Sequence, residues 1–194
     1  MDLRYFLFSN RSFTPIPLVL VILYLSSLSY PYFIIGIGLI LVGESIRIYG
    51  VRFAGGATRT REIGAPSLCT SGPYSRCRNP LYLGNMIIYC GVVLMAGGQF
   101  LWPLLFIVFF FFILQYSMII SLEEETLVKL FGNEYQLYRE SVPRLFPRIS
   151  PWVGIDKRVP LTIIQTLKTE KRTLQNIIII IILIGAKNYY GFSL

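Results

Sequence analysis

The sequence predicts an all-α fold, a polytopic membrane helix bundle with about five transmembrane helices and an interfacial amphipathic helix after the fourth. Hydrophobic residues make up 54% of the 194 positions and charged residues only 14%, a balance far more apolar than that of an average soluble domain. Apolar stretches of roughly membrane length alternate with tight turns and with polar, basic segments. The chain is therefore expected to be a multi-pass integral membrane protein.

The first two predicted spans lie close together near the N-terminus. Residues 15–30 carry no charge, and Pro31 ends this helix and starts a second span that reaches about residue 51. No small-residue cleavage site follows the first apolar run, so we expect it to remain as a membrane helix. Glu44 and Arg47 lie three residues apart near the end of the second span and can pair on one helix face. They form either a structural ion pair or part of a polar site.

The third span is predicted at residues 81–98 and the fourth at 100–122, separated by a small turn. Asn79 followed by Pro80 indicates the start of the third helix. Asparagine caps free backbone N–H groups, and proline fits the first helical position, where its missing N–H costs nothing.

The segment after residue 122 predicts an amphipathic helix at the membrane interface. Its apolar positions recur at helical spacing and include Leu127, Leu130, Phe131 and Leu137.

The C-terminal apolar run, residues 177–186, is too short to span a membrane alone. Leu174 before it and aromatic residues after it extend it to a fifth, interface-anchored helix. The chain then divides into N-terminal helices (1–53), a core with helices three and four and the amphipathic helix (54–149), and a C-terminal extension (150–194).

Positive charge predicts how the chain is oriented. The sequence holds 18 Lys+Arg against 10 Asp+Glu, a net charge of +8. The bases collect in residues 123–172 and in the loop 52–79, which contains Arg52, Arg59, Arg61, Arg76 and Arg78. Cytoplasmic loops carry such an excess, so both segments are expected to face the cytoplasm, with a prokaryotic cytoplasmic membrane favoured over the endoplasmic reticulum. The excess suits anionic lipid head groups, and no nucleic-acid motif accompanies it.

The cysteines do not predict a metal site. Cys69, Cys77 and Cys90 lack metal-ligand spacing, and the chain has no histidine to complete a Cys/His set. We expect free, structural thiols and no bound metal.

One face of the third helix combines polar and amphipathic side chains. Four of them fall at positions i, i+4, i+7 and i+11, namely Arg78, Tyr82, Asn85 and Tyr89. A second stripe, Gly84 and Gly91, lacks side chains and admits either a neighbouring helix or a flat ligand.

Three consecutive glutamates, Glu123, Glu124 and Glu125, end the predicted fourth span. Carboxylates oppose the dipole at a helix C-terminus, so helix propensity does not explain them there. They form either a surface charge cluster or, with the edge from Arg78 to Tyr82, a mixed-charge pocket at the cytoplasmic interface.

These blocks together resemble a family of integral-membrane methyltransferases. The segments "GPYSRCRNPLYLGN", "EEETLVKLFGNEYQLY" and "VPRLFP", with a hydrophobic span between the first two, are similar to the isoprenylcysteine carboxyl methyltransferases and phospholipid N-methyltransferases. That pattern is Arg-His-Pro-x-Tyr-x-Gly, a span, then Glu-Glu, and here it occupies residues 78–84 and 123–124. The resemblance extends from about Gly64 to Pro147. It departs at Asn79, which replaces the family's histidine and cannot act as a base near neutral pH.

The resemblance implies S-adenosylmethionine as cofactor and methyl transfer to a lipid or prenylated acceptor, either an isoprenylcysteine carboxylate or a phospholipid amine, in contact with membrane lipids. It implies catalytic roles for Arg78, Glu123 and Glu124, and substrate binding by Arg144 and Tyr89. The implied cofactor-binding residues are Gly72, Pro73, Tyr74, Arg78, Asn79, Pro80, Tyr82, Gly84, Asn85, Glu123 and Glu124.

The chemistry of these residues is consistent with the implied cofactor. A helix N-terminus and Arg78 can hold a carboxylate, a glutamate can hold an ammonium group, and tyrosine rings favour a sulfonium. Two other classes stay open, a nicotinamide-dependent isoprenoid or sterol reductase and a non-enzymatic transporter or scaffold. Transport sites usually lie near the bilayer midplane, whereas the polar groups here gather at one interface.

Overall fold

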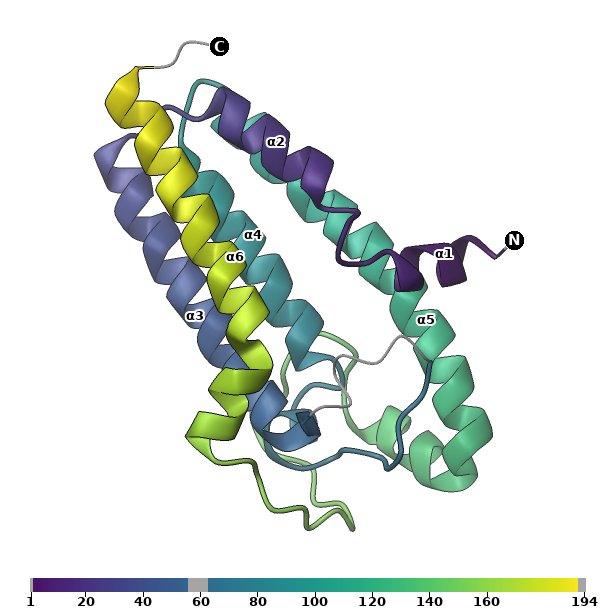
Figure 1. Ribbon diagram of the computed structural model, residues 1–194. Coiled ribbons are helices and arrows are strands. Elements are labelled where there is room, and N and C mark those ends of the chain that lie inside the picture. The colour runs from purple at the N-terminus through teal and green to yellow at the C-terminus, as the bar shows by residue number, and fades with distance from the viewer. Residues whose placement is uncertain (1, 56–62, 192–194) are drawn as a thin grey trace.

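The computed structural model describes residues 2–55 and 63–191 and is an all-helical bundle, which confirms the predicted fold class (Figure 1). Its elements are α1 (Leu3–Ser9), α2 (Ile16–Leu25), α3 (Tyr30–Ala54), the 3₁₀ turn η2 (Gly72–Ser75), α4 (Pro80–Ala96), α5 (Leu101–Ser141) and α6 (Ile163–Tyr190). The predicted loop arginines Arg59 and Arg61 lie outside the described residues.

Three of the described helices, α3, α5 and α6, are long and apolar enough to cross a membrane. The sequence predicted about five such spans. The predicted fifth helix is confirmed, because α6 extends the short isoleucine run to 28 residues. The first span was predicted too long: α2 has 10 residues, about 15 Å of helix and half of the hydrocarbon core. Helix α4 has 17 residues, about 26 Å of helix, which is also shorter than the hydrocarbon core.

Glycines set the distance between α3 and α4, which pack extensively along their length. A Cβ on Gly43 would lie 2.7 Å from the Gly84 carbonyl oxygen, and a Cβ on Gly36 would lie 2.5 Å from that of Gly91. The two backbones therefore touch where Gly36 and Gly43 of α3 cross the glycine stripe of α4, as in small-residue interfaces of membrane helices. The stripe on α4 thus serves helix packing, the first of its two interpretations, and α3 occupies the space beside Gly84.

Helix α5 is longer than expected. The predicted fourth span and the amphipathic segment form one element of 41 residues, interrupted at Gly132, whose φ of 52° and ψ of −127° are not helical. Beyond this kink the buried side chains are Tyr135 and Tyr138. Leu130 and Leu137 are exposed, as expected for side chains at a membrane interface.

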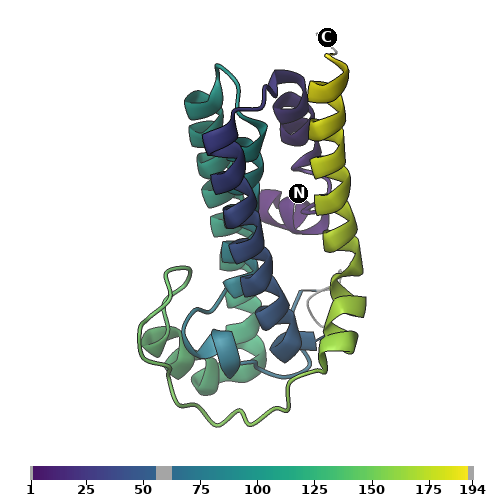
Figure 2. The ribbon, with the colours of Figure 1, turned by 90° about the vertical axis from the view of Figure 1, so that its left-hand side faces the viewer.

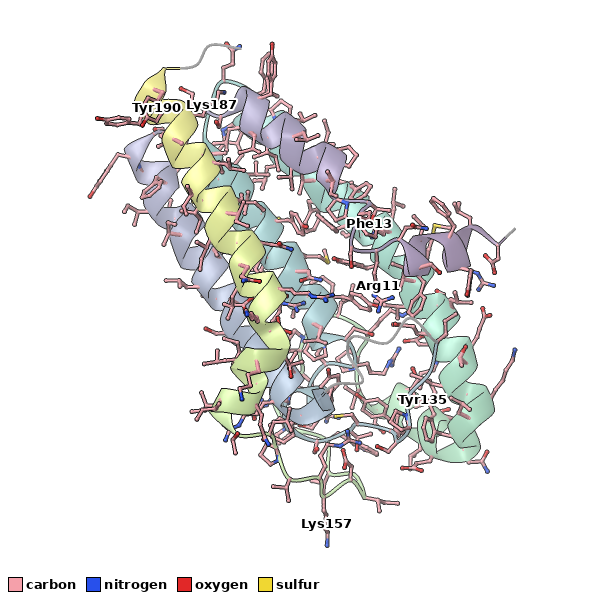
Figure 3. The ribbon with its side chains drawn as sticks, in the orientation of Figure 1. Arg11, Phe13, Tyr135, Lys157, Lys187 and Tyr190 are labelled. Atoms are coloured by element: carbon pink, nitrogen blue, oxygen red, sulfur yellow. The ribbon has the colours of Figure 1, made fainter. Side chains whose placement is uncertain are left out.

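The molecule has two distinct ends. At one end the tight turns before α3 and after α4 meet, where the Ser27 N–H donates to the Ala96 carbonyl (2.9 Å). Lys187 of α6 reaches the same end and donates to the Ser26 carbonyl (3.0 Å). The long connections before α4 and before α6 lie at the other end (Figure 2). In Figure 3, Lys157 marks this second end and Tyr190 the first.

Candidate active site

Glu124 of α5 ties together the segment just before α4 and the segment after α5. Its carboxylate is 4% exposed and accepts from Arg78 Nη2 (2.7 Å) and from Arg144 Nη2 (2.5 Å). Arg78 also donates to the carbonyls of Arg139 (2.5 Å) and Val142 (2.6 Å). The structure therefore brings together three residues predicted from the sequence, Arg78, Glu124 and Arg144. Their charges and hydrogen-bonding groups are largely taken up by one another. Such charge-assisted bonds in a buried site are strong.

Glu123 faces a different set of groups. The Tyr82 hydroxyl donates to its carboxylate (2.9 Å). The Tyr82 ring lies against Tyr116 of α5, with centroids 4.6 Å apart, and Asn85 Nδ2 donates to the Tyr116 hydroxyl (3.1 Å). This pairing confirms that the predicted face of α4 meets α5 at the glutamates. Tyr116 was missed because nothing in its sequence context distinguishes it from other aromatic residues of an apolar helix.

The three glutamates do not lie at a helix end, contrary to prediction. Helix α5 continues to Ser141, so the dipole argument does not apply to them. The third carboxylate, Glu125, is exposed and pairs with Arg4 of α1 (2.5 Å). The surface interpretation therefore holds for Glu125, whereas Glu123 and Glu124 face the α4 edge.

Asn79 was predicted to cap α4 with its side chain, and that prediction is wrong. Its side chain makes no capping bond to the helix, and Nδ2 instead donates to the Arg144 carbonyl (3.0 Å). The Asn79 amide is used to hold the segment after α5. Pro80 does occupy the start of the helix, as predicted.

The predicted residues Gly72, Pro73 and Tyr74 form η2, below the start of α4. Gly72 adopts a φ of 59° against the Phe53 ring, and the Tyr138 hydroxyl donates to the Tyr74 carbonyl (2.8 Å). Burial raises the pKa of Tyr74 well above its ordinary value, so this hydroxyl stays neutral. These three residues support the base of the site, and the charge of Glu123 acts on Tyr74.

The chain after α5 is fastened to the segment before α4. The Arg78 N–H donates to the Pro143 carbonyl (3.0 Å) and the Trp152 N–H to the Ser75 carbonyl (2.8 Å). The Cys77 thiol contacts the Leu145 carbonyl (3.2 Å), and burial raises the pKa of this thiol to about 11. It is therefore a protonated, free cysteine, as expected for all three.

Asp156 makes a further attachment to the segment before α4. It accepts from the backbone N–H groups of Thr70 (2.9 Å) and Ser71 (3.2 Å) and from Arg158 Nε (2.9 Å). Burial raises the pKa of Asp156, but these hydrogen bonds outweigh it and leave the pKa below its ordinary value. This carboxylate therefore stays ionised and holds the loop in place at neutral pH.

Tyr89, predicted to bind substrate, lies deeper in the bundle. Its ring stacks on Phe112 of α5 with centroids 4.3 Å apart, and Phe112 in turn stacks on Tyr116 (5.3 Å). The aromatic rings thus form a continuous column from Tyr82 into the apolar interior. Such a column offers π faces and an apolar wall next to Glu123.

Arg11 also approaches this column and was not predicted as a site residue. It lies on the segment between α1 and α2 (Figure 3). Its Cζ atom is 4.2 Å from the centre of the Phe8 ring, and its charge acts on Glu123 and Tyr82. The sequence could not identify Arg11 as a site residue, because its approach to the column depends on α1 folding back onto α5.

A cavity of about 560 Å³ lies nearby, between the end of α3 and the kinked end of α5. None of the predicted site residues lines it. Two of its arginines are engaged in structural bonds, Arg158 with Asp156 and Arg52 with the Leu161 carbonyl (3.0 Å). Three of its four charged residues, Arg52, Asp156 and Arg158, therefore fasten loops, and Glu134 is the fourth. The best-supported candidate site is the constellation around Glu123 and Glu124.

Comparison with known proteins decides the family. Residues 31–134, more than half of the chain, match the phospholipid methyltransferase family. The chain belongs to this family. The match confirms the resemblance seen in the sequence and spans α3, α4 and α5 as far as the Gly132 kink, including Arg78, Tyr82, Glu123 and Glu124.

Relatives of this phospholipid methyltransferase family member carry several names. Methanethiol S-methyltransferase 2 of Bradyrhizobium diazoefficiens is 34% identical over 102 residues, which cover 53% of this chain and 37% of that protein. A cobalt-zinc-cadmium resistance protein of Cupriavidus metallidurans is 35% identical over 88 residues, or 45% of this chain and 39% of that protein. The protein-S-isoprenylcysteine O-methyltransferase of Schizosaccharomyces pombe is 38% identical over 84 residues, or 42% and 34%.

The chain spans between 34% and 39% of the length of these curated relatives. No solved structure matches it. The family match agrees with the presence of helices long and apolar enough to cross a membrane. This is an integral membrane protein of a methyltransferase family.

Proposed function

We propose that this protein is an S-adenosylmethionine-dependent methyltransferase that acts on a lipid-like acceptor at the cytoplasmic interface. The observation that carries the proposal is the meeting of Glu123 with Tyr82 beside the Glu124 ion pairs. All of these residues belong to the blocks that resemble the membrane methyltransferases. The two basic connections lie at the same end of the molecule, which supports a site facing the cytoplasm.

The donor set suits the chemistry of the cofactor. The carboxylate of Glu123 would hold the ammonium group, and the faces of Tyr82 and Tyr116 would favour the sulfonium. The side chain of Arg144 is 38% exposed and retains donors beyond its bond to Glu124, so it would hold a carboxylate. Arg78 would act through Glu124, because its own donors are taken up by Glu124 and by main-chain carbonyls.

When bound, the cofactor supplies an electrophilic methyl group, and the protein's own task is positioning in a dry site. The aromatic column from Tyr82 to Phe112 excludes water on one side. We propose that the region 54–149 forms this core, with the helices of 1–53 and of 150–194 as its flanks.

The candidate acceptors differ in whether they must lose a proton before they can accept the methyl group. A prenylcysteine carboxylate reacts as its anion, whereas a phospholipid ammonium must first lose a proton. A small thiol is a second candidate acceptor, favoured by the relatives named methanethiol S-methyltransferases, and it too reacts after losing a proton. With no histidine in the chain, Glu123 is the candidate proton acceptor for the amine and thiol cases.

Calorimetric titration of S-adenosylmethionine into the detergent-purified protein tests the proposal. We expect saturable binding that Glu123→Gln weakens by roughly tenfold, the loss of about one charged hydrogen bond. Glu125→Gln is the matched control, because the carboxylate of Glu125 is exposed and pairs with Arg4 of α1. Absence of binding to the unaltered protein would overturn the cofactor assignment.

Methyl transfer from radiolabelled cofactor to a farnesylated cysteine, a phosphatidylethanolamine vesicle and methanethiol then separates the acceptor classes. For an amine or thiol, Glu123→Gln lowers the rate at saturating cofactor and the loss shrinks as pH rises, because more acceptor is already deprotonated. For a carboxylate, the same change raises the apparent KM for the cofactor and leaves the saturated rate nearly unchanged.

A further inference from the structure

A run of hydrogen bonds, completed by one ring contact, connects α6 to the candidate site. Arg47 of α3 donates through Nη2 to Glu170 of α6 (2.8 Å) and through Nη1 to the Asn85 side-chain oxygen (2.7 Å). Asn85 Nδ2 donates to the Tyr116 hydroxyl (3.1 Å). The Tyr116 ring lies against Tyr82, which donates to Glu123. Four helices thus contribute to one chain of contacts that ends at the site.

Glu170 is the most deeply buried charged group in this run. It is 0% exposed, and Arg47 is 9% exposed. A guanidinium inside a membrane helix bundle requires a counter-charge, because no bulk water solvates it there. Glu44 approaches Arg47 only to 3.8 Å, whereas Nη2 of Arg47 lies 2.8 Å from the Glu170 carboxylate. The same Nη2 also donates to the Thr173 hydroxyl of α6 (3.3 Å), but Glu170 supplies the nearer counter-charge.

We propose that Glu170 is a positioning residue for the site, which it reaches through Arg47 and Asn85. Glu170 fixes the guanidinium of Arg47. That guanidinium holds the Asn85 amide with its oxygen toward Arg47 and its nitrogen toward Tyr116. Tyr116 then forms the surface on which the Tyr82 ring rests while its hydroxyl donates to Glu123. The catalytic consequence of this chain rests on the proposed function.

Glu170 lies in the C-terminal extension, residues 150–194, so this positioning role is supplied by the extension. The family match ends at residue 134, so α6 lies outside it. The extension thereby contributes to the placement of two residues, Tyr82 and Glu123, that lie inside the matched region. If Glu170 merely clamped α6 onto α3, removing it would lower stability and leave the tyrosines in place.

Fluorine NMR of protein labelled with 3-fluorotyrosine distinguishes these two roles without any cofactor. The Tyr82 and Tyr116 resonances are assigned from Tyr82→Phe and Tyr116→Phe variants. Glu170→Ala is expected to shift both resonances by more than their line width. Thr166→Val is the matched control, because Thr166 is 0% exposed one turn earlier on α6 and has no part in the contact chain. Unmoved Tyr82 and Tyr116 resonances in Glu170→Ala would overturn the proposal.

Glu170→Gln keeps an acceptor for Arg47 while removing the charge, and it carries the test if the alanine variant does not fold. We expect it to shift the same two resonances in the same direction, by less. Resonances identical to those of the unaltered protein in Glu170→Gln and in any folded Glu170→Ala would refute the positioning role.

Cofactor titration adds a functional readout. Glu170→Ala is expected to weaken S-adenosylmethionine binding by about two- to thirty-fold, the range for residues that act through a network. Its effect should be less than additive with that of Tyr82→Phe, because both act on the same hydroxyl. Additive effects would contradict the proposal. Failure of the unaltered protein to bind cofactor would instead contradict the proposed function, while the fluorine shifts still decide the role of Glu170.

Discussion

Glu123 and Glu124 are neighbours in the sequence, but they have different partners. Glu124 is 4% exposed and accepts from two arginines, so it joins α5 to the segment just before α4 and to the segment after α5. Glu123 accepts from the Tyr82 hydroxyl at the foot of the aromatic column. Consecutive residues of a helix point about 100° apart. One carboxylate can therefore stabilise the fold through two arginines while the other, bonded only to the Tyr82 hydroxyl among the described hydrogen bonds, keeps acceptor capacity for a ligand.

Glutamine substitutions should separate these two roles. Glu124→Gln removes the charge that the buried guanidinium of Arg78 shares with the more exposed one of Arg144. We expect it to lower the free energy of unfolding by about 1–3 kcal/mol. Glu123→Gln keeps an acceptor for Tyr82 and should change stability little while weakening cofactor binding. Unfolding in detergent, followed by circular dichroism, together with calorimetric titration measures both. Equal losses of stability in the two variants would contradict the division.

At the scale of the elements, the crossing of α3 and α4 is the contact that positions the site. The glycines of both helices meet backbone to backbone, so α4 lies close enough for Asn85 to reach Arg47 of α3. The sequence showed the stripe on α4, but its partners at Gly36 and Gly43 were not singled out. Their role depends on which face of α3 turns toward α4.

Alanine at Gly43 tests this crossing. A Cβ there would lie 2.7 Å from the Gly84 carbonyl oxygen, so the two helices must separate, and we expect a loss of about 1–3 kcal/mol in the free energy of unfolding. Gly38 of the same helix is the control, because a Cβ there meets nothing within 4 Å. Gly38→Ala should be neutral or gain up to about 1 kcal/mol from helix propensity. Similar losses at both positions would exclude a specific contact at Gly43.

At the scale of the whole molecule, the two ends differ in chain connection and in charge. The short turns at residues 26–29 and 97–100 carry no charged residue. The connections before α4 and before α6 are long, basic and joined by the bonds of Asp156 and Arg158. This asymmetry is the physical basis for our proposal that the candidate site faces the cytoplasm.

Cysteine labelling in intact cells or sealed vesicles tests that orientation. In a variant without Cys69, Cys77 and Cys90, the exposed positions Gln99 and Lys157 are replaced singly by cysteine. A membrane-impermeant maleimide should label Gln99→Cys from outside and Lys157→Cys only after the membrane is opened. Labelling of both positions from the same side would show that the two ends are not separated by the membrane.

The sequence by itself determined the class of molecule and the chemistry present. Its apolar runs and its proline at the start of α4 predicted a membrane helix bundle. Its arginine and glutamate blocks left two interpretations open, a surface charge cluster and the meeting of the face at Arg78 and Tyr82 with the glutamates. These features are local or periodic, so they can be seen without knowing how the chain folds. The length of α2, the continuation of α5 past Leu122 and the bond of Asn79 to the segment after α5 were not predicted correctly, because tertiary contacts override local signals at element ends.

Only the tertiary structure decided which of several equivalent polar groups serves the site. Arg47, Glu170, Tyr116 and Arg11 come from four separate segments. The sequence singled out only Arg47 among them, as a partner of Glu44, and gave no sign of its bonds to Glu170 and Asn85. In a membrane bundle a buried charge must find its partner on another helix, since neither lipid nor water provides one. That partner is chosen by helix register and crossing, here by the glycine contact of α3 with α4 and by the docking of α6 on α3, which place Glu170 beside Arg47 although 123 residues separate them along the chain.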